Sequence, residues 1–133
     1  MSSRLLSDCR PEFADLATKW LAACLAEGLD ILVYCTLRSI AEQDALFQQG
    51  RTLPGRVVTN AIGGQSAHNF GLALDHVPLL NGKAQWAAGN ALYVHSIHIA
   101  MGCGLESLAG SRFPEWCHLQ MPGWKAISEL TKV

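Results

Sequence analysis

The sequence predicts an α+β fold, in which several helices accompany a few short strands. Its 133 residues are the length of one domain, and we expect a single domain over residues 1–133. Half of the residues are hydrophobic and 16% are charged, which supplies a core and excludes a disordered chain. Because helical segments are mixed with only a few short strands, the α+β class is favoured over a doubly wound sheet.

The first half of the chain is predicted to contain two helices, a strand and a loop. Apolar residues recur at helical spacing from Pro11 to Glu27, just before a glycine. The run from Ile31 to Leu37 is β-branched and aromatic, which is typical of a strand. Ser39-Ile-Ala-Glu42 has the capping-box pattern, so a second helix is expected from there to Gly50. Residues 51–65 are rich in proline and glycine and are expected to form a loop.

The second half is predicted to contain two strands and two helices. Leu72 to Val77 has the composition of a strand and is followed by a proline. Trp86 to Met101 has the pattern of a helix that glycines terminate. Trp116 to Met121 is predicted as the last strand and Trp124 to Lys132 as a short terminal helix.

Charge and composition exclude several classes of protein. Ten basic and eleven acidic residues give a net charge of −1, which argues against a nucleic-acid partner. Apolar stretches are far shorter than the ~20 residues of a membrane span, and the N-terminus lacks the apolar run of a secretory signal. The cysteines are odd in number and lack CxxC spacing, so we expect reduced thiols and no zinc ribbon. They are Cys9, Cys24, Cys35, Cys103 and Cys117.

A first group of chemically informative residues lies between Gly64 and Asp75. If a strand begins at Leu72, Asp75 lies on one face of it and His76 on the other. His68 precedes the turn that leads into this strand, so one turn can bring its imidazole to the Asp75 carboxylate. Zinc accepts both types of ligand. The spacing therefore predicts a metal site.

A second group lies between Phe113 and Gln120. His118 and Gln120 share one face of the last predicted strand, and Glu115 lies in the turn that enters it. A carboxylate in that position can act as a general base beside a metal held by His118. Taken singly, each of these residues has an ordinary structural explanation, as a surface or satisfied core residue. Three protein ligands with an open fourth position would be the arrangement of a catalytic site.

The two groups together resemble the paired signature of the M15 zinc peptidases, which is Ser66-x-His68-x-x-Gly71-x-Ala73-x-Asp75 followed by Glu115-x-x-His118. That family includes D-Ala-D-Ala carboxypeptidases, D-Ala-D-Ala dipeptidases and phage L-alanyl-D-glutamate endolysins. The stretch from Thr36-Leu-Arg38-Ser39 to Val58-Thr59-Asn60 is similar to the endolysin branch. The resemblance covers roughly residues 29–122 and, with two motifs in the right order, is specific.

The resemblance implies a role for each matching residue. One zinc ion is expected to be held by His68, Asp75 and His118. Glu115 matches the catalytic carboxylate, Arg38 matches the arginine that stabilises the oxyanion or binds substrate, and Ser66 matches a serine that hydrogen-bonds within the site or to substrate. The implied fold is the small fold shared by Hedgehog domains and D,D-peptidases, with a short antiparallel sheet flanked by helices.

The function implied is that of a zinc peptidase that cuts peptidoglycan stem peptides, as an L-Ala-D-Glu endopeptidase and a phage or prophage endolysin. The alternatives are a D-Ala-D-Ala carboxypeptidase or dipeptidase and a non-catalytic Hedgehog-like metal-binding module. We expect a monomer with no wall-binding domain and no stable membrane association. It would be made in the bacterial cytoplasm and act on the wall after the membrane is permeabilised. One departure is that Gly104 to Arg112 lacks the Trp-Gly-Gly-x-Trp stretch of many endolysins, which leaves the scissile bond open.

Three residues are expected to have no part in this site, although their types invite one. His95 and His98 lie one turn apart on a predicted helix and are interpreted as part of an amphipathic face. Cys117 adjoins His118, and regular strand alternation predicts that it points into the packing on the opposite face.

Overall fold

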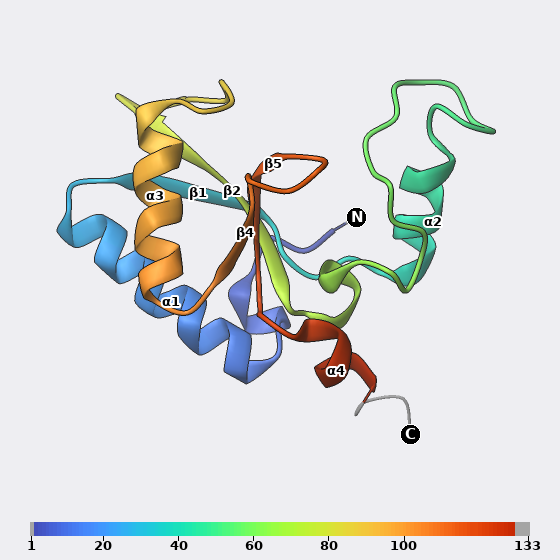
Figure 1. The fold of residues 1–133 in the computed structure, drawn as a ribbon, viewed down its shortest axis with the longest axis horizontal. Coiled ribbons are helices and arrows are strands. Elements are labelled where there is room, and N and C mark those ends of the chain that lie inside the picture. Colours follow the sequence, from blue (N-terminus) through green and yellow to red (C-terminus); the bar gives the residue numbers. More distant parts are fainter. Residues whose placement is uncertain (1, 130–133) are drawn as a thin grey trace.

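The structure, a computed structural model, describes residues 2–129 and contains one five-stranded sheet (Figure 1). Four strands are hydrogen-bonded in the antiparallel order β1-β2-β5-β4, and β3 extends one end of the sheet by pairing with β2. The strands are β1 Asp30–Cys35, β2 Ala73–Leu80, β3 Lys83–Ala84, β4 Glu106–Leu108 and β5 Glu115–Gln120. The predicted α+β class is confirmed.

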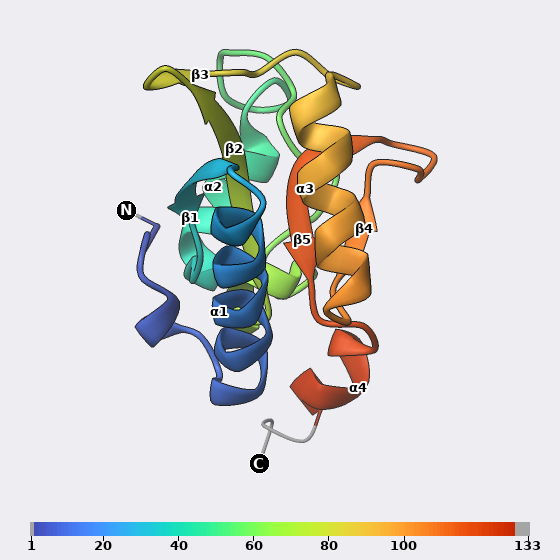
Figure 2. The ribbon, with the colours of Figure 1, turned by 90° about the vertical axis from the view of Figure 1, so that its left-hand side faces the viewer.

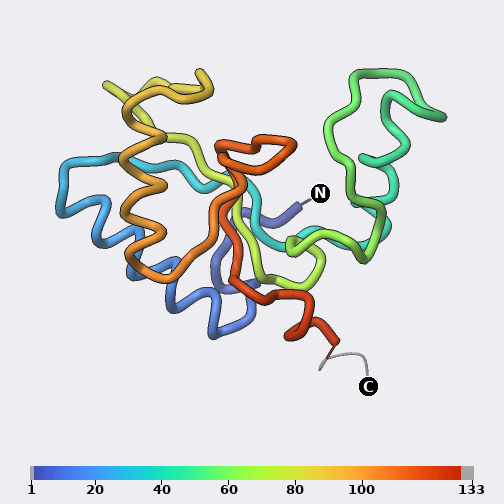
Figure 3. Tube along the Cα trace, in the orientation of Figure 1, coloured from blue at the N-terminus to red at the C-terminus, as the bar shows by residue number. Residues whose placement is uncertain are grey.

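Four α-helices and two short 3-10 helices surround this sheet. The α-helices are α1 Pro11–Ala26, α2 Ile40–Gln48, α3 Ala91–Gly102 and α4 Trp124–Glu129, and the 3-10 helices are η1 Leu6–Asp8 and η2 Ala67–Phe70. Helices α1 and α3 lie side by side against one face of the sheet (Figure 2). Helix α2 and the long loop after it stand at the other side of the molecule (Figure 3). No helix within residues 2–129 is long and apolar enough to cross a membrane.

The hydrophobic core lies between the sheet and the pair α1 and α3. Its fully buried side chains include Phe13 and Trp20 of α1 and Leu74 and Leu119 of the central strands. Their burial removes large apolar surfaces from water, which is the main stabilising contribution in a domain of this size. The opposite face of β2 and β5 is thereby left for polar side chains.

His76 confirms the predicted alternation along β2. Its ring is fully buried on the core face, in edge contacts with Trp20 and Tyr93. Its Nδ1 donates to the Cys117 carbonyl at 2.8 Å, and its Nε2 accepts from the Ser96 hydroxyl at 2.9 Å. His76 is therefore a satisfied core histidine that points away from Asp75.

Several element boundaries differ from those predicted. Helix α3 begins at Ala91, not Trp86, because the Asn90 side chain accepts from the Tyr93 backbone N–H at 2.9 Å and caps the helix there. Strand β2 continues past Val77 to Leu80, since it pairs with β1 along its length and turns into β3. The C-terminal part of the predicted last helix lies outside the described residues.

Strand β1 is shorter than predicted, and β4 was not predicted at all. β1 ends at Cys35 after a register shift, and Thr36 and Leu37 instead exchange backbone hydrogen bonds with Ser3 of the N-terminal segment. β4 has only three residues, too few for a detectable alternation, and it is stabilised by pairing with β5. Both differences arise from contacts between segments far apart in the chain.

Candidate metal centre

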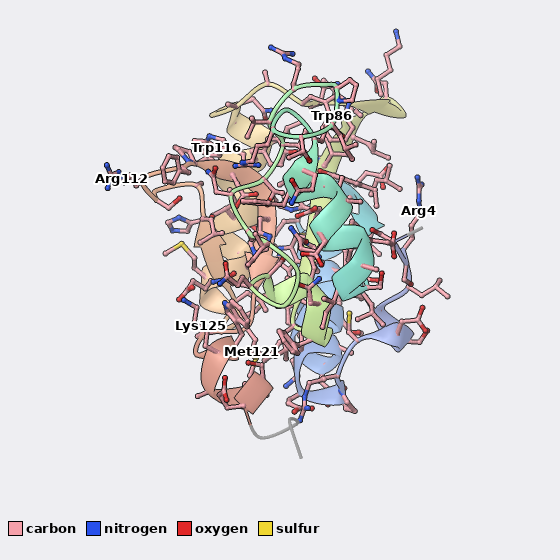
Figure 4. All side chains as sticks on the ribbon, turned by 90° about the vertical axis from the view of Figure 1, so that its right-hand side faces the viewer. Arg4, Trp86, Arg112, Trp116, Met121 and Lys125 are labelled. Carbon is pink, nitrogen blue, oxygen red and sulfur yellow. The ribbon has the colours of Figure 1, made fainter. Side chains whose placement is uncertain are left out.

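A polar cavity lies on the face of the sheet opposite α1 and α3. Its volume is about 540 Å³, and it is bounded by β1, β2 and β5, by η2 and α4, and by α2 with the loop after it. In Figure 4, which faces α2, the labelled Trp116 and Lys125 lie on the side of β5 and α4. All six residues predicted for the site line this cavity: Arg38, Ser66, His68, Asp75, Glu115 and His118.

Strand pairing brings Asp75 and His118 together. They are direct cross-strand partners in the antiparallel pair β2 and β5, so their side chains leave the same face of the sheet as neighbours. The Nδ1 atom of His118 lies 3.5 Å from Oδ1 of Asp75. Both side chains are largely buried.

His68 reaches the same carboxylate from η2. The Ser66 hydroxyl accepts from the His68 backbone N–H at 3.3 Å, and the Asn69 side chain accepts from the Ser66 N–H at 3.2 Å, which closes a capping box around this turn. Gly71 then ends the turn with φ +68, where a Cβ would meet backbone atoms of Arg10 and Cys9 at 3.0 and 3.1 Å. Ser66 thus acts on His68 through the backbone.

The hydrogen bonds of the two imidazoles define which nitrogen is available to a metal. His68 Nδ1 donates to the Thr36 carbonyl at 2.7 Å, so Nε2, which lies 3.2 Å from Asp75 Oδ1, is the nitrogen available to a metal once its proton is displaced. His118 Nε2 donates to Oε1 of Gln120 at 2.8 Å, which leaves its Nδ1 lone pair facing the same oxygen. Ligand atoms 2.0–2.1 Å from a tetrahedral metal lie about 3.3 Å apart. The two separations fit that value.

Electrostatics inside the cavity favour an ionised carboxylate. Burial by itself raises the pKa of Asp75, but the charge of His68 and the contacts of the carboxylate with His118 and His68 outweigh it and hold that pKa far below its usual range. Burial likewise lowers the pKa of His68, and the Asp75 carboxylate reverses this and raises it to about 10. The metal-free site therefore carries a proton on His68 that a cation must displace.

Cys35 is a further candidate donor that the sequence analysis did not include. Its Sγ and one donor atom each of His68 and Asp75 lie within 4.8 Å of one another. The sulfur, however, faces the Nδ1 side of His68 at 3.8 Å, the nitrogen that donates to Thr36. It also accepts from the Arg38 guanidinium at 3.2 Å. The cation beside it and its position on the far side of the ring favour His118 over Cys35 as the third ligand.

Glu115 and Arg38 line the same cavity as the three proposed ligands. Glu115 is exposed and is the first residue of β5, not part of the preceding turn as predicted. Arg38 has Nη2 3.9 Å from Asp75 Oδ2, while its Nη1 donates to Gln43 Oε1 at 2.9 Å. A second cavity of about 560 Å³ shares Glu115 with the first and extends the hollow past it toward Phe113.

The prediction that Cys117 points into the packing on the face opposite His118 is wrong. Cys117 lines the cavity beside His118, because regular pairing of β5 with β2 ends at His118 and the alternation breaks there. Burial raises the pKa of its thiol to about 12, with Tyr34 as a hydrogen-bond partner, so the group is a neutral thiol at neutral pH. His95, in turn, pairs with Glu27 at 2.9 Å on the far side of the molecule, as expected of a helix-surface residue.

The cavity brings together two imidazoles and a carboxylate, and a second carboxylate lines it too. This is the composition of a hydrolytic metal site. Residues 7–96 match the VanY family of D-alanyl-D-alanine carboxypeptidases. The chain is 35% identical over 124 residues to the peptidoglycan L-alanyl-D-glutamate endopeptidase CwlK of Bacillus subtilis (strain 168), with 86% of this chain and 74% of that protein covered. The chain therefore belongs to the VanY (M15) peptidase family.

Solved structures show the same fold. The L-Ala D-Glu endopeptidase ChiX of Serratia marcescens superposes with a TM-score of 0.72 at 18% identity, covering 95% of this chain and 92% of that one. A variant of the D,D-pentapeptidase VanY from a VanB-type resistance cassette, in complex with Zn(II), superposes with a TM-score of 0.64 at 16% identity. That match covers 92% of this chain and 77% of VanY. The predicted D,D-peptidase-like fold is confirmed.

Proposed function

We propose that the protein is a zinc endopeptidase that hydrolyses the L-Ala–D-Glu bond of peptidoglycan stem peptides. The observation that carries this proposal is the convergence of His68 Nε2 and His118 Nδ1 on Asp75 Oδ1, in a cavity that also contains Glu115. The activities named for CwlK and ChiX support the choice of bond.

Zinc would be held by His68, Asp75 and His118. Two neutral nitrogens and one carboxylate are a donor set of the kind that holds zinc in catalytic sites. When bound, zinc lowers the pKa of a water molecule and polarises a carbonyl group. The backbone carbonyl that holds His68 and the amide that holds His118 keep the two ligand nitrogens directed at the Asp75 carboxylate.

Glu115 and Arg38 supply the remaining chemistry. The Glu115 carboxylate takes a proton from the attacking water and later gives it to the departing amine. The Arg38 guanidinium, positioned by Gln43, offers N–H groups to the oxyanion that forms at the scissile carbonyl. Ser66 contributes by positioning His68 and by lining the cavity.

The shape of the cavity favours cleavage within a chain over removal of its last residue. The first and second cavities meet at Glu115, so hollows extend on both sides of the general base. An endopeptidase must accommodate substrate on both sides of the scissile bond. A carboxypeptidase needs only a closed pocket for the terminal residue on one side.

The test is digestion of purified peptidoglycan followed by mass spectrometry, with and without a chelator. We expect new D-Glu amino termini, no release of D-Ala, loss of activity on chelation and recovery with zinc. Release of D-Ala instead would identify a D-Ala-D-Ala carboxypeptidase or dipeptidase. A zinc-loaded protein that leaves peptidoglycan intact would identify a non-catalytic metal-binding module.

We further propose that the protein acts as a phage or prophage endolysin. It would be made in the bacterial cytoplasm and reach the cell wall after the membrane is permeabilised. The similarity of residues 36–60 to the endolysin branch supports this role. Expression inside a bacterial host should leave cells intact until a membrane-permeabilising agent is added and should then cause rapid lysis. Lysis without the agent, or none with it, would contradict the endolysin role and leave the peptidase assignment standing.

A further inference from the structure

The tautomer of His118 is controlled by two side chains outside the ligand set. His118 Nε2 donates to Gln120 Oε1 at 2.8 Å, and Gln120 Nε2 donates to Glu106 Oε1 at 2.6 Å. His118 and Gln120 are buried. Glu106 is exposed on the edge strand β4, and its carboxylate is the outer end of this row of hydrogen bonds. The three residues form a continuous relay from the surface to the metal centre.

The direction of this relay follows from donor and acceptor chemistry. An ionised carboxylate can only accept, so Glu106 requires the NH₂ group of Gln120 to face it. The amide oxygen of Gln120 then faces His118 and can only accept. His118 must therefore carry its proton on Nε2, and its Nδ1 lone pair is left facing Asp75.

Strand register explains why these three side chains meet. Gln120 pairs with Glu106 of β4 on one side and with Ala73 of β2 on the other. Gln120 and His118 are two residues apart on β5 and share its cavity face. The small side chain of Ala73 leaves room beside the Gln120 amide.

The two histidines differ in how their tautomers are maintained. His68 donates to the backbone carbonyl of Thr36, which no substitution can remove. His118 depends on an amide, whose two ends differ only in whether they donate or accept. Without the carboxylate, the amide can rotate by 180° and donate to His118 Nε2, which moves the ring proton to Nδ1 and blocks the ligand atom.

We propose that Glu106 is a positioning residue of the metal centre: acting through Gln120, it maintains the His118 tautomer that presents Nδ1 to zinc. This inference rests on the proposed function, because it takes His118 as a zinc ligand. Partners that orient metal-bound histidines typically contribute about 10–100-fold to metal affinity.

The test is Glu106→Gln, which preserves size and leaves the core intact because Glu106 is exposed. The zinc dissociation constant is measured by competition with a chelator, and the tautomer of His118 is measured by long-range ¹H–¹⁵N NMR of the metal-free protein. We expect zinc binding to weaken about 10–100-fold. We also expect the protonated nitrogen of His118 to change from Nε2 in the native protein to a mixture that includes Nδ1.

Two controls separate the relay from a simple loss of negative charge. Glu115→Gln removes the same charge from a carboxylate that lines the cavity itself and should retain near-native zinc affinity and an unchanged His118 tautomer. In Glu106→Gln combined with Gln120→Glu, the carboxylate at position 120 accepts from His118 directly, so both affinity and tautomer should recover. Asp15→Asn, on the exposed side of α1, should change neither quantity.

The outcomes distinguish failure of the relay from failure of the proposed function. One outcome is that Glu106→Gln binds zinc as the native protein does and keeps the Nε2–H tautomer, while His118→Ala loses zinc. That outcome refutes the relay and leaves the proposed ligand set standing. Equal losses in Glu106→Gln and Glu115→Gln, with no change of tautomer, would also refute it. If His118→Ala keeps native zinc affinity, the ligand set itself is wrong and the relay falls with it.

Discussion

At the scale of single residues, the metal centre depends on which nitrogen of each histidine carries the proton. His68 presents Nε2 and His118 presents Nδ1. The difference arises because His68 is approached by a backbone carbonyl of the segment after β1, and His118 by a side chain of its own strand. Both arrangements direct the nitrogen that is available to a metal at the Asp75 carboxylate.

Substitutions at Glu115 and His118 should separate catalysis from metal binding. His118→Ala removes a ligand, so we expect loss of zinc and, through the lost binding energy, a lower melting temperature. Glu115→Gln removes only the proton acceptor, so we expect it to keep zinc and fold while turnover falls ~10²–10⁴-fold. Metal content, melting temperature and turnover are measured on both variants. Loss of zinc from Glu115→Gln would show that Glu115 is a ligand instead.

Zinc binding should release a proton from His68. In the metal-free protein the Asp75 carboxylate raises the pKa of His68 to about 10, whereas zinc requires the neutral ring. At pH 8 we therefore expect release of close to one proton and an affinity that rises with pH. Calorimetric titrations in two buffers of different ionisation enthalpy measure the number of protons. The variant His76→Gln should give the same number, and a count of zero in the native protein would contradict the assigned pKa.

At the scale of elements, helix α2 and the loop after it form one wall of the cavity and are joined to Arg38 by a single buried side chain. Gln43 is fully buried in α2. Its Oε1 accepts from Arg38 at 2.9 Å, and its Nε2 donates to the Ala61 carbonyl at 2.8 Å and to the Thr59 hydroxyl at 3.3 Å. One amide therefore fixes both the guanidinium and the loop that borders the substrate cavity.

The variant Gln43→Leu should impair substrate turnover while leaving zinc binding intact. Leucine fills the same space but leaves the Ala61 carbonyl and Arg38 without their partner, which costs about 1–3 kcal/mol. We expect a kcat/KM at least tenfold lower, faster proteolysis within residues 51–65 and an unchanged zinc affinity, because no proposed ligand contacts Gln43. Gln48→Leu, on the same helix, serves as the control. Native kcat/KM in Gln43→Leu would exclude this role.

At the scale of the whole molecule, the sheet separates an apolar face from a polar one, and the imidazole of His76 is buried on the apolar side. Burial lowers its pKa to about 4, from an unfolded value near 6.5. The unfolded chain therefore binds more protons than the folded one between these values, so stability falls as pH falls from 6.5 to 4. The total loss expected is about 3 kcal/mol.

This pH dependence can be measured on the metal-free protein by denaturant unfolding between pH 6.5 and 4. In that window the pair formed by His68 and Asp75 contributes no slope. The raised pKa of His68 gives stability that is lost only above pH 6.5, and the lowered pKa of Asp75 gives stability that is lost only below about 4. His76→Gln should flatten the profile, whereas His98→Gln, on the exposed side of α3, should not. An unchanged slope in His76→Gln would refute the assignment.

Much of the fold and of the candidate site could be predicted because local patterns and motifs report it directly. Helix α1 follows the period of its apolar residues, and α2 begins where its capping box does. The alternation along β2 correctly assigned Asp75 to the cavity and His76 to the core. The paired motifs and the stretch around Arg38 identified residues from four segments, and the structure places all six predicted site residues around one cavity.

Other features of the site depend on contacts between segments far apart in the chain, which no local pattern reports. The sequence carries no sign that Cys35 lies beside His68, that Gln43 holds Arg38, or that Cys117 leaves the regular alternation. The three-residue strand β4 has no detectable period, yet its pairing with β5 brings Glu106 to Gln120. The sequence alone predicted the side chains that line the cavity, because these form short motifs. Which nitrogen each histidine presents follows instead from hydrogen-bond partners that only the folded sheet brings within reach.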